Sequence, residues 1–155
     1  MAGRIDARLK ELGIELAEAP APVANYVPYA ITGNLVFVSG QITLWNGEVK
    51  HTGVVGDDLT VEDGQAAARM CAINLIAQVK AACGGDLDRV KRVVRLGGFV
   101  NSAPGFSQQP AVINGASDLM GEVFGEAGRH ARAAVGAQGL PLGVAVEVEG
   151  TFEIE

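Results

Sequence analysis

The C-terminal stretch of residues 130–149 constrains the fold most, because its second half follows the two-residue period of a strand. Residues 144–149 alternate strictly between valine and other side chains: Val144, Ala145, Val146, Glu147, Val148 and Glu149. Successive side chains of a strand point to opposite faces, so the valines take one face and both glutamates take the other. The sequence therefore predicts a sheet strand with one apolar face and one face that carries carboxylates.

An arginine opens the first half of this stretch. Arg132 begins a segment of small residues, and a Leu140-Pro141 connection joins that segment to the alternating strand. A guanidinium near a carboxylate in a sheet can hold a planar anionic substrate beside a group that handles protons. Arg132 and Glu147 are nearly equidistant from the connection. We therefore expect the two residues to come level, even if the last strand steps over the strand predicted at residues 90–100.

The rest of the chain predicts an α+β fold. Its elements are strands at 25–31 and 35–41, a hairpin at 42–50, a helix at 60–83, a strand at 90–100, a helix at 110–128 and strands at 130–137 and 144–149. Asn46-Gly47 favours the hairpin, Thr60 can cap the first long helix, and Pro110 suits the first turn of the second. This order predicts a mixed sheet with both long helices on one face and a right-handed parallel crossover between residues 90 and 137.

The N-terminal segment differs in character from the rest. Residues 3–13 place Ile5, Leu9 and Leu12 at the spacing of a short amphipathic helix. Pro20 and Pro22 then favour an extended linker. We expect residues 1–21 to form a helix and linker docked on one main domain, which comprises residues 22–155.

Composition limits the classes of function. The 155 residues are 48% hydrophobic and only 19% charged, which argues for a packed domain and for an oligomer whose interfaces replace solvated faces. The net charge of −6 argues against nucleic acid as a partner. No apolar run approaches the roughly 20 residues of a membrane span, and the charges that follow Met1 lead us to expect no signal peptide.

The cysteines and histidines indicate neither a disulfide nor a metal site. Cys71 and Cys83 fall in one predicted helix about 18 Å apart, at ~1.5 Å rise per residue, so they cannot pair with each other. A reduced, cytoplasmic setting fits this usage best. His51 and His130 show no metal-ligand spacing with the cysteines.

Several of these segments together resemble the RidA/YjgF family of enamine/imine deaminases, here in a longer form with an N-terminal helix. The matching residues are Arg132-Ala133-Ala134-Val135, Leu140-Pro141, the hydrophobic-Glu-hydrophobic-Glu strand at 146–149, the Gly-Asn-hydrophobic-Ser-Gly-Gln strand at 33–41, Tyr26 and Asn114. The resemblance covers residues 22–154.

The resemblance implies a chorismate-mutase-like fold that assembles as a homotrimer with sites in the clefts between subunits. Its implied activity is hydrolysis of 2-iminoacids and 2-enaminoacids to 2-ketoacids and ammonia, without a metal or organic cofactor. By the same resemblance Arg132 clamps the substrate carboxylate and Glu147 positions or activates water. The implied cleft residues are Tyr26, Ser39 and Asn114, with backbone groups of Gly40 and Ala134.

The chain departs from the common pattern at Ala134, where many deaminases carry Cys, and at Gly139, where short members carry a basic residue. These departures indicate a distinct branch. Arg132 can instead be the structural ion-pair partner of Glu147 or Glu149, and the other cleft residues can be plain surface or interface positions. Two other functions remain open. One is a non-catalytic trimer that binds small carboxylates or regulates a partner. The other, which the acidic charge disfavours, is a ribonuclease or translation inhibitor.

Overall fold

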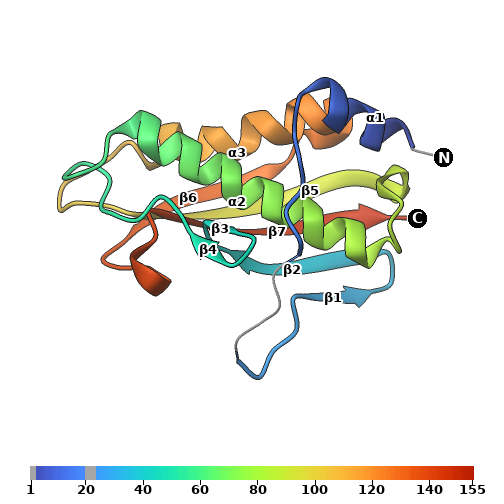
Figure 1. The fold of residues 1–155 in the computed structure, drawn as a ribbon, viewed down its shortest axis with the longest axis horizontal. Coiled ribbons are helices and arrows are strands. Elements are labelled where there is room, and N and C mark those ends of the chain that lie inside the picture. The colour runs from blue at the N-terminus through green and yellow to red at the C-terminus, as the bar shows by residue number, and fades with distance from the viewer. Residues whose placement is uncertain (1–2, 20–23) are drawn as a thin grey trace.

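A computed structural model describes residues 3–19 and 24–155, and its framework is a five-stranded mixed sheet (Figure 1). The strands are β1 (Tyr29–Thr32), β2 (Leu35–Gln41), β5 (Val90–Asn101), β6 (Ala131–Ala137) and β7 (Val146–Ile154), in the spatial order β1-β2-β7-β5-β6. β5 and β6 run parallel, and the other neighbours are antiparallel. β3 (Leu44–Trp45) and β4 (Glu48–Val49) form a separate hairpin. The predicted α+β fold, the hairpin and the parallel crossover connection are confirmed.

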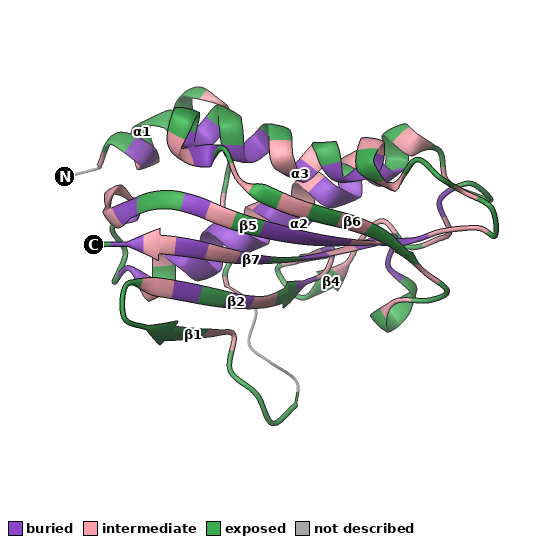
Figure 2. Ribbon diagram, turned by 180° about the vertical axis from the view of Figure 1, so that it is seen from behind, coloured by how far each residue is buried: buried purple, intermediate pink, exposed green. Residues whose placement is uncertain are grey.

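Both long helices cover the same face of the sheet, as predicted (Figures 1 and 2). They are α2 (Val61–Ala82) and α3 (Gln109–Phe124); α1 (Arg4–Glu11) lies beside α3, and the short 3-10 turns are η1 (Leu87–Arg89), η2 (Gly125–Gly128) and η3 (Pro141–Gly143). The start of α2 is fixed by a reciprocal capping box, in which Thr60 and Asp63 each accept a hydrogen bond from the other's backbone N–H. None of the helices in the described ranges is long and apolar enough to cross a membrane.

The core lies between the helices and this face of the sheet. Its largest fully buried side chains include Leu75 and Ile76 of α2, Leu96 of β5, Ile113 of α3 and Phe152 of β7. Burial of such apolar surface stabilises the fold by roughly 25 cal/mol per Å². The alternation predicted for the last strand is observed, because β7 buries every second residue.

The opposite face of the sheet has no helix over it in the described chain (Figure 2). The open face carries large apolar side chains that are exposed: Phe37 of β2 is 45% exposed and Val135 of β6 is 48% exposed. Each lies level with a residue whose side chain points the same way, Phe37 with Thr151 and Val135 with Phe99. β7 and β5 lie between the strands that carry Phe37 and Val135, so the two exposed side chains stand on different parts of this open face.

Three predicted boundaries differ from the structure. The first strand begins at Tyr29 rather than residue 25, because Pro28 just before it has no N–H for a ladder. The last strand continues to Ile154, well beyond Glu149. The second long helix ends at Phe124, since Gly125 adopts a positive φ of 61° and the chain passes into a 3-10 turn. The predicted Pro20-Pro22 linker lies outside the described residues.

The N-terminal helix α1 docks through its N-terminal end as well as its apolar face. Ile5 and Leu9 are buried in the core. The backbone N–H groups of Arg4 and Ile5 both donate to the Asp88 carboxylate, at 2.9 Å each. Asp88 therefore serves as the N-terminal cap that Gly3 cannot supply.

We predict that Asp88→Ala loosens α1 without changing the sheet. The hydrogen bonds from Ile5 and Arg4 lower the pKa of Asp88, so its ionised form is favoured in the folded state. The stabilisation is present above the ordinary aspartate pKa of about 3.9 and is lost as the pH falls through the lowered value. Hydrogen exchange of the amides of residues 4–11 should be faster in Asp88→Ala at neutral pH. Asp57→Ala, at an exposed loop carboxylate, should leave it unchanged.

Candidate functional site

Arg132 lies on the helix-covered face of the sheet. In β6 it is level with the fully buried Leu96 of β5, and its guanidinium reaches up to α3. There Nη1 donates to Asn114 Oδ1 at 2.8 Å and to Ser117 Oγ at 3.1 Å. Asn114 was predicted from the sequence as a site residue, and the structure places it directly against Arg132. Arg132 is not paired with Glu147 or Glu149, which removes the structural ion-pair alternative within one chain.

Two further residues complete this group, and the sequence-based prediction missed both. Ser117 Oγ lies 2.9 Å from His130 Nε2, and His130 Nδ1 lies 2.7 Å from the backbone oxygen of Gly128. We call Asn114, Ser117, His130 and Arg132 the arginine cluster. The signal for it was present in the spacing, because Ser117 follows Asn114 by three helical residues and His130 precedes Arg132 by two extended ones.

The arginine cluster borders a hollow of about 330 Å³. Its lining residues are Ser117, Gly121, Gly128, Arg129, His130 and Arg132. Ala134 lies two residues beyond Arg132, on the same face, and packs against the core. Its side chain is therefore occupied with packing, and only its backbone remains for the role predicted for it.

Glu147 lies on the open face, on the other side of the sheet. Its neighbours Val146 and Val148 are fully buried toward the helices, so alternation turns Glu147 outward. A Cβ at Gly40 would stand 3.0 Å from the Glu147 carboxyl, so glycine at this bulge lets the carboxylate lie against the β2 backbone. Partial burial, with the nearby charge of Glu149 second, raises the pKa of Glu147 above its ordinary value.

Ser39, Gly40, Glu147 and Glu149 form what we call the glutamate cluster. Ser39 Oγ donates to the backbone oxygen of Val27 at 2.7 Å, which ties the segment before β1 to β2. A hollow of about 310 Å³ runs past Val27, Ser39, Gly40 and Glu149. Glu149 is ion-paired with Arg95 of β5 at 3.6 Å. Tyr26 is 51% exposed and lies in the segment before β1, so the structure does not place it in the first strand as predicted.

The expectation that Arg132 and Glu147 come level is wrong. Across the sheet Arg132 aligns with Leu96 and then with Gly150, whereas Glu147 aligns with Phe99 and then with Val135. The two residues are thus offset by three positions, roughly 10 Å at ~3.3 Å per residue, and they face opposite sides. The equidistance argument fails because β5 lies between β6 and β7, and the parallel β5–β6 pairing sets the register of Arg132.

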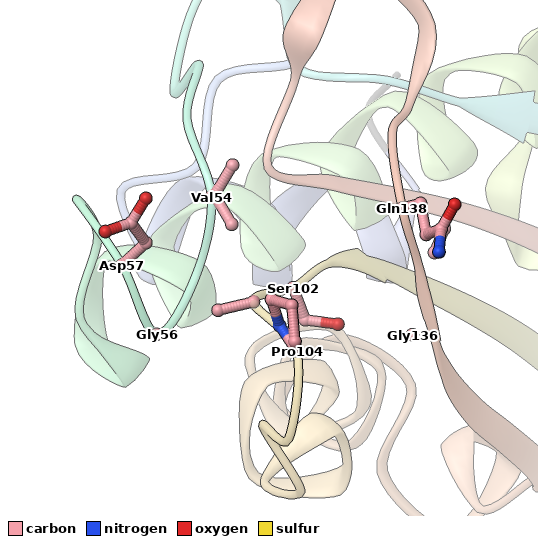
Figure 3. Close-up of a pocket in the computed structure, with 9 residues that line it drawn as sticks. Val54, Gly56, Asp57, Ser102, Pro104, Gly136 and Gln138 are labelled. Carbon is pink, nitrogen blue, oxygen red and sulfur yellow. The ribbon is translucent and has the colours of Figure 1, made fainter.

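A larger hollow of about 790 Å³ lies at the end of β5 and β6 (Figure 3). Val54, Gly56 and Asp57 border it on one side, Gly136 and Gln138 on another, and Ser102 and Pro104 between them. None of the predicted site residues lines it. Among the residues that do, Asp57 is the one carrying a charge, and this arrangement indicates no particular ligand.

The described residues contain no group of three His, Cys, Asp or Glu side chains that could hold a metal ion. Cys71 and Cys83 are both buried and free, and burial raises the pKa of each thiol. A thiol whose pKa is raised in this way is a poor nucleophile. Neither cysteine therefore adds a nucleophile to the arginine cluster or the glutamate cluster.

Comparison with known proteins gives concordant results. Residues 6–149 match the family described as "YjgF/chorismate_mutase-like, putative endoribonuclease". Protein TCP17 of Trypanosoma cruzi is 54% identical over 153 residues, which cover 98% of this chain and 95% of the relative. A 2-iminobutanoate/2-iminopropanoate deaminase of Dermatophagoides farinae is 31% identical over 137 residues, covering 88% and 91%.

A solved structure with the same fold is that of the protein Atu1372 of Agrobacterium tumefaciens, whose function is unknown. It superposes with a TM-score of 0.90 at 52% identity, and the match covers 97% of this chain and 93% of that one. The family match spans nearly the whole chain, and its fold agrees with the sheet and helices described above. The chain belongs to the YjgF/chorismate mutase-like family, as its Arg132 and Glu147 segments predicted.

Proposed function

We propose that this protein hydrolyses reactive 2-imino and 2-enamino acids to 2-ketoacids and ammonia, in clefts between the subunits of a cytoplasmic homotrimer. The observation that carries the proposal is the separation of two complementary half-sites. One is a guanidinium held by Asn114 and Ser117, and the other is a carboxylate, Glu147, with a raised pKa. The deaminase relative at 31% identity supports the choice of reaction.

The separation of the half-sites leads to the trimer. Arg132 and Glu147 of one chain face opposite sides of the sheet, so they cannot share a small substrate within that chain. The open face that carries Glu147 also exposes Phe37 and Val135, which a second subunit would cover. In a closed ring each subunit gives its arginine cluster to one cleft and its glutamate cluster to the next.

The chemistry follows from these two groups. Arg132 binds the substrate carboxylate and sets the imine carbon in place, which lowers the barrier by orientation. Glu147 removes a proton from water as the oxygen attacks the imine carbon, and this proton passes to the imine nitrogen, which gives a carbinolamine. Glu147 then takes the proton of the new hydroxyl group and passes it to the amino nitrogen. The C=O bond forms as the C–N bond breaks, so that ammonia leaves and the 2-ketoacid remains. An enamine first takes a proton on carbon to become the imine.

Glu147 is tuned toward this role by its surroundings. A base with a raised pKa has a higher proton affinity and so takes a proton from water more readily. The ion pair between Arg95 and Glu149 partly offsets the charge that Glu149 adds beside it. Tyr26, Ser39 and Gly40 lie on the same chain as Glu147, and in this proposal they line its side of the cleft.

We predict that Arg132→Ala abolishes acceleration of ketoacid release. A charge-assisted contact is worth roughly 1.5–3 kcal/mol, so affinity for a 2-ketoacid should fall about ten- to a hundredfold. Glu147→Gln should keep that affinity and slow hydrolysis, because Gln cannot accept the proton. A coupled assay in which a pyridoxal-phosphate dehydratase generates the imine measures turnover, and calorimetric titration measures affinity.

The control for the arginine variant is Arg129→Ala, because Arg129 borders the same hollow but pairs with the exposed Glu126. Wild-type 2-ketoacid affinity in a folded Arg132→Ala protein would contradict the proposed site. Binding without turnover in the wild type would instead identify a carboxylate-binding protein, the non-catalytic alternative.

The pH dependence of turnover offers a separate prediction. Since Glu147 must be ionised to act as a base, kcat/KM should rise with pH through a value above the ordinary glutamate pKa of about 4.3. Glu149→Gln removes the nearby negative charge and should move this acid limb to lower pH. Burial is the larger cause, so the limb should not return fully to the ordinary value. Glu153→Gln, further along β7, is the control, and an unmoved limb in Glu149→Gln would refute the assignment of Glu147 as the base.

The trimer can be tested at its proposed interface. Val135→Asp places a charge on the open face of the sheet, where burial against another subunit would be costly. Sedimentation should show a trimer for the wild type and smaller species for the variant, with turnover lost in parallel. Lys10→Glu, on the exposed side of α1, should remain trimeric. A wild-type monomer at micromolar concentration would rule out the intersubunit site.

A further inference from the structure

The hydrogen bonds behind Arg132 have a definite direction. The backbone oxygen of Gly128 can only accept, so His130 Nδ1 carries a hydrogen and donates to it over 2.7 Å. In a neutral ring Nε2 then has a lone pair, which accepts from the Ser117 hydroxyl at 2.9 Å. The Ser117 oxygen is left to accept from Arg132 Nη1 at 3.1 Å. Each group in this series of hydrogen bonds thus orients the next, from the Gly128 carbonyl through His130 and Ser117 to the Arg132 guanidinium.

The Gly128 carbonyl, where this series of hydrogen bonds begins, is held in place by close backbone packing. Gly128 is buried, and a Cβ there would collide with the backbone oxygen of Met120. The glycine therefore lets η2 pack directly on the end of α3, and its carbonyl group is held in place by that backbone contact. His130 consequently has a fixed acceptor, in the way that the orienting partner of a histidine fixes which ring nitrogen is protonated.

At the other end of this series of hydrogen bonds, the Nη1 group of the Arg132 guanidinium is held in place. Nη1 has two hydrogens, and the structure directs one to Asn114 and the other to Ser117. Within the described part of the molecule, Nε and Nη2 have no such partner among the hydrogen bonds of Arg132. Nε–H and one Nη2–H point in parallel, which is the geometry that binds both oxygens of a carboxylate.

We propose that Ser117 and His130 are positioning residues that anchor the Nη1 corner of Arg132 and leave its Nε–Nη2 edge for the carboxylate of the ligand. The ligand class rests on the proposed function; the anchoring itself does not. A preorganised guanidinium loses less side-chain freedom on binding, so the anchor increases affinity for the carboxylate. It has no part in the proton transfers at Glu147, so its loss should change KM and ligand affinity more than kcat.

The test compares Ser117→Ala, Ser117→Thr and Asp118→Ala, with pyruvate as the titrated 2-ketoacid. Ser117→Ala removes the link between His130 and Arg132 and should weaken pyruvate binding and raise KM by about three- to tenfold, with a smaller change in kcat. Ser117→Thr retains the hydroxyl and should restore both values. Asp118 is the next residue on α3 and is exposed, so Asp118→Ala should match the wild type. In an Arg132→Lys background, which lacks Nη1, Ser117→Ala should add no further loss.

A spectroscopic measurement tests the anchor without any ligand. The chain has two histidines, so ¹⁵N NMR of the wild type and of His51→Gln assigns the ring of His130. The proposal expects the neutral ring to carry its hydrogen on Nδ1 and not on Nε2. A neutral ring protonated at Nε2, or unchanged pyruvate affinity in folded Ser117→Ala, would overturn it. Pyruvate binding that Arg132→Ala does not weaken would instead refute the proposed function, and the NMR result would still decide the anchor.

Discussion

One-sided burial of the sheet is the constraint on which the rest of this structure depends. α2 and α3 both pack on the face that carries Leu96 and Phe152, and burial of that face supplies the core. Every second residue of β7 is thereby committed to packing, and the residues between them face away. The carboxylates Glu147 and Glu149 and the exposed Phe37 and Val135 share this open face. In the proposed trimer, this open face both contacts the neighbouring subunit and carries the carboxylate that activates water.

The same constraint keeps opposite charges apart within a chain. If Arg132 and Glu147 were level on one face, they would neutralise each other, and the raised pKa of Glu147 would become a lowered one. β5 separates their strands and alternation separates their faces, so each stays available to a ligand. On the open face Arg95 forms an ion pair with Glu149. Among the salt bridges of the described residues, none involves Glu147.

Local patterns in the sequence predicted those features that local physics determines. The capping residues of α2, the Asn46-Gly47 hairpin and the alternation of β7 all follow from the residues themselves. The register of Arg132 does not, because it depends on its parallel partner Leu96, which lies 36 residues earlier in the chain. Tyr26 was misplaced because Pro28 delays the start of β1. His130 was considered only as a metal ligand, although its spacing from Arg132 already indicated a shared face.

The arginine cluster also shows what a family pattern leaves open. The matched residues Arg132 and Asn114 account for one of the two hydrogen bonds at Nη1, and Ser117 with His130 account for the other. Ala134, where many deaminases carry a thiol, faces the core on this side of the sheet, so its identity affects packing more than proton transfer. In the proposed function, the arginine cluster recognises the carboxylate, which all 2-imino acids share. In the proposed trimer, the segment from Tyr26 to Gly40 of the neighbouring subunit lies opposite the arginine cluster. That segment would then discriminate among the side chains of different 2-imino acids.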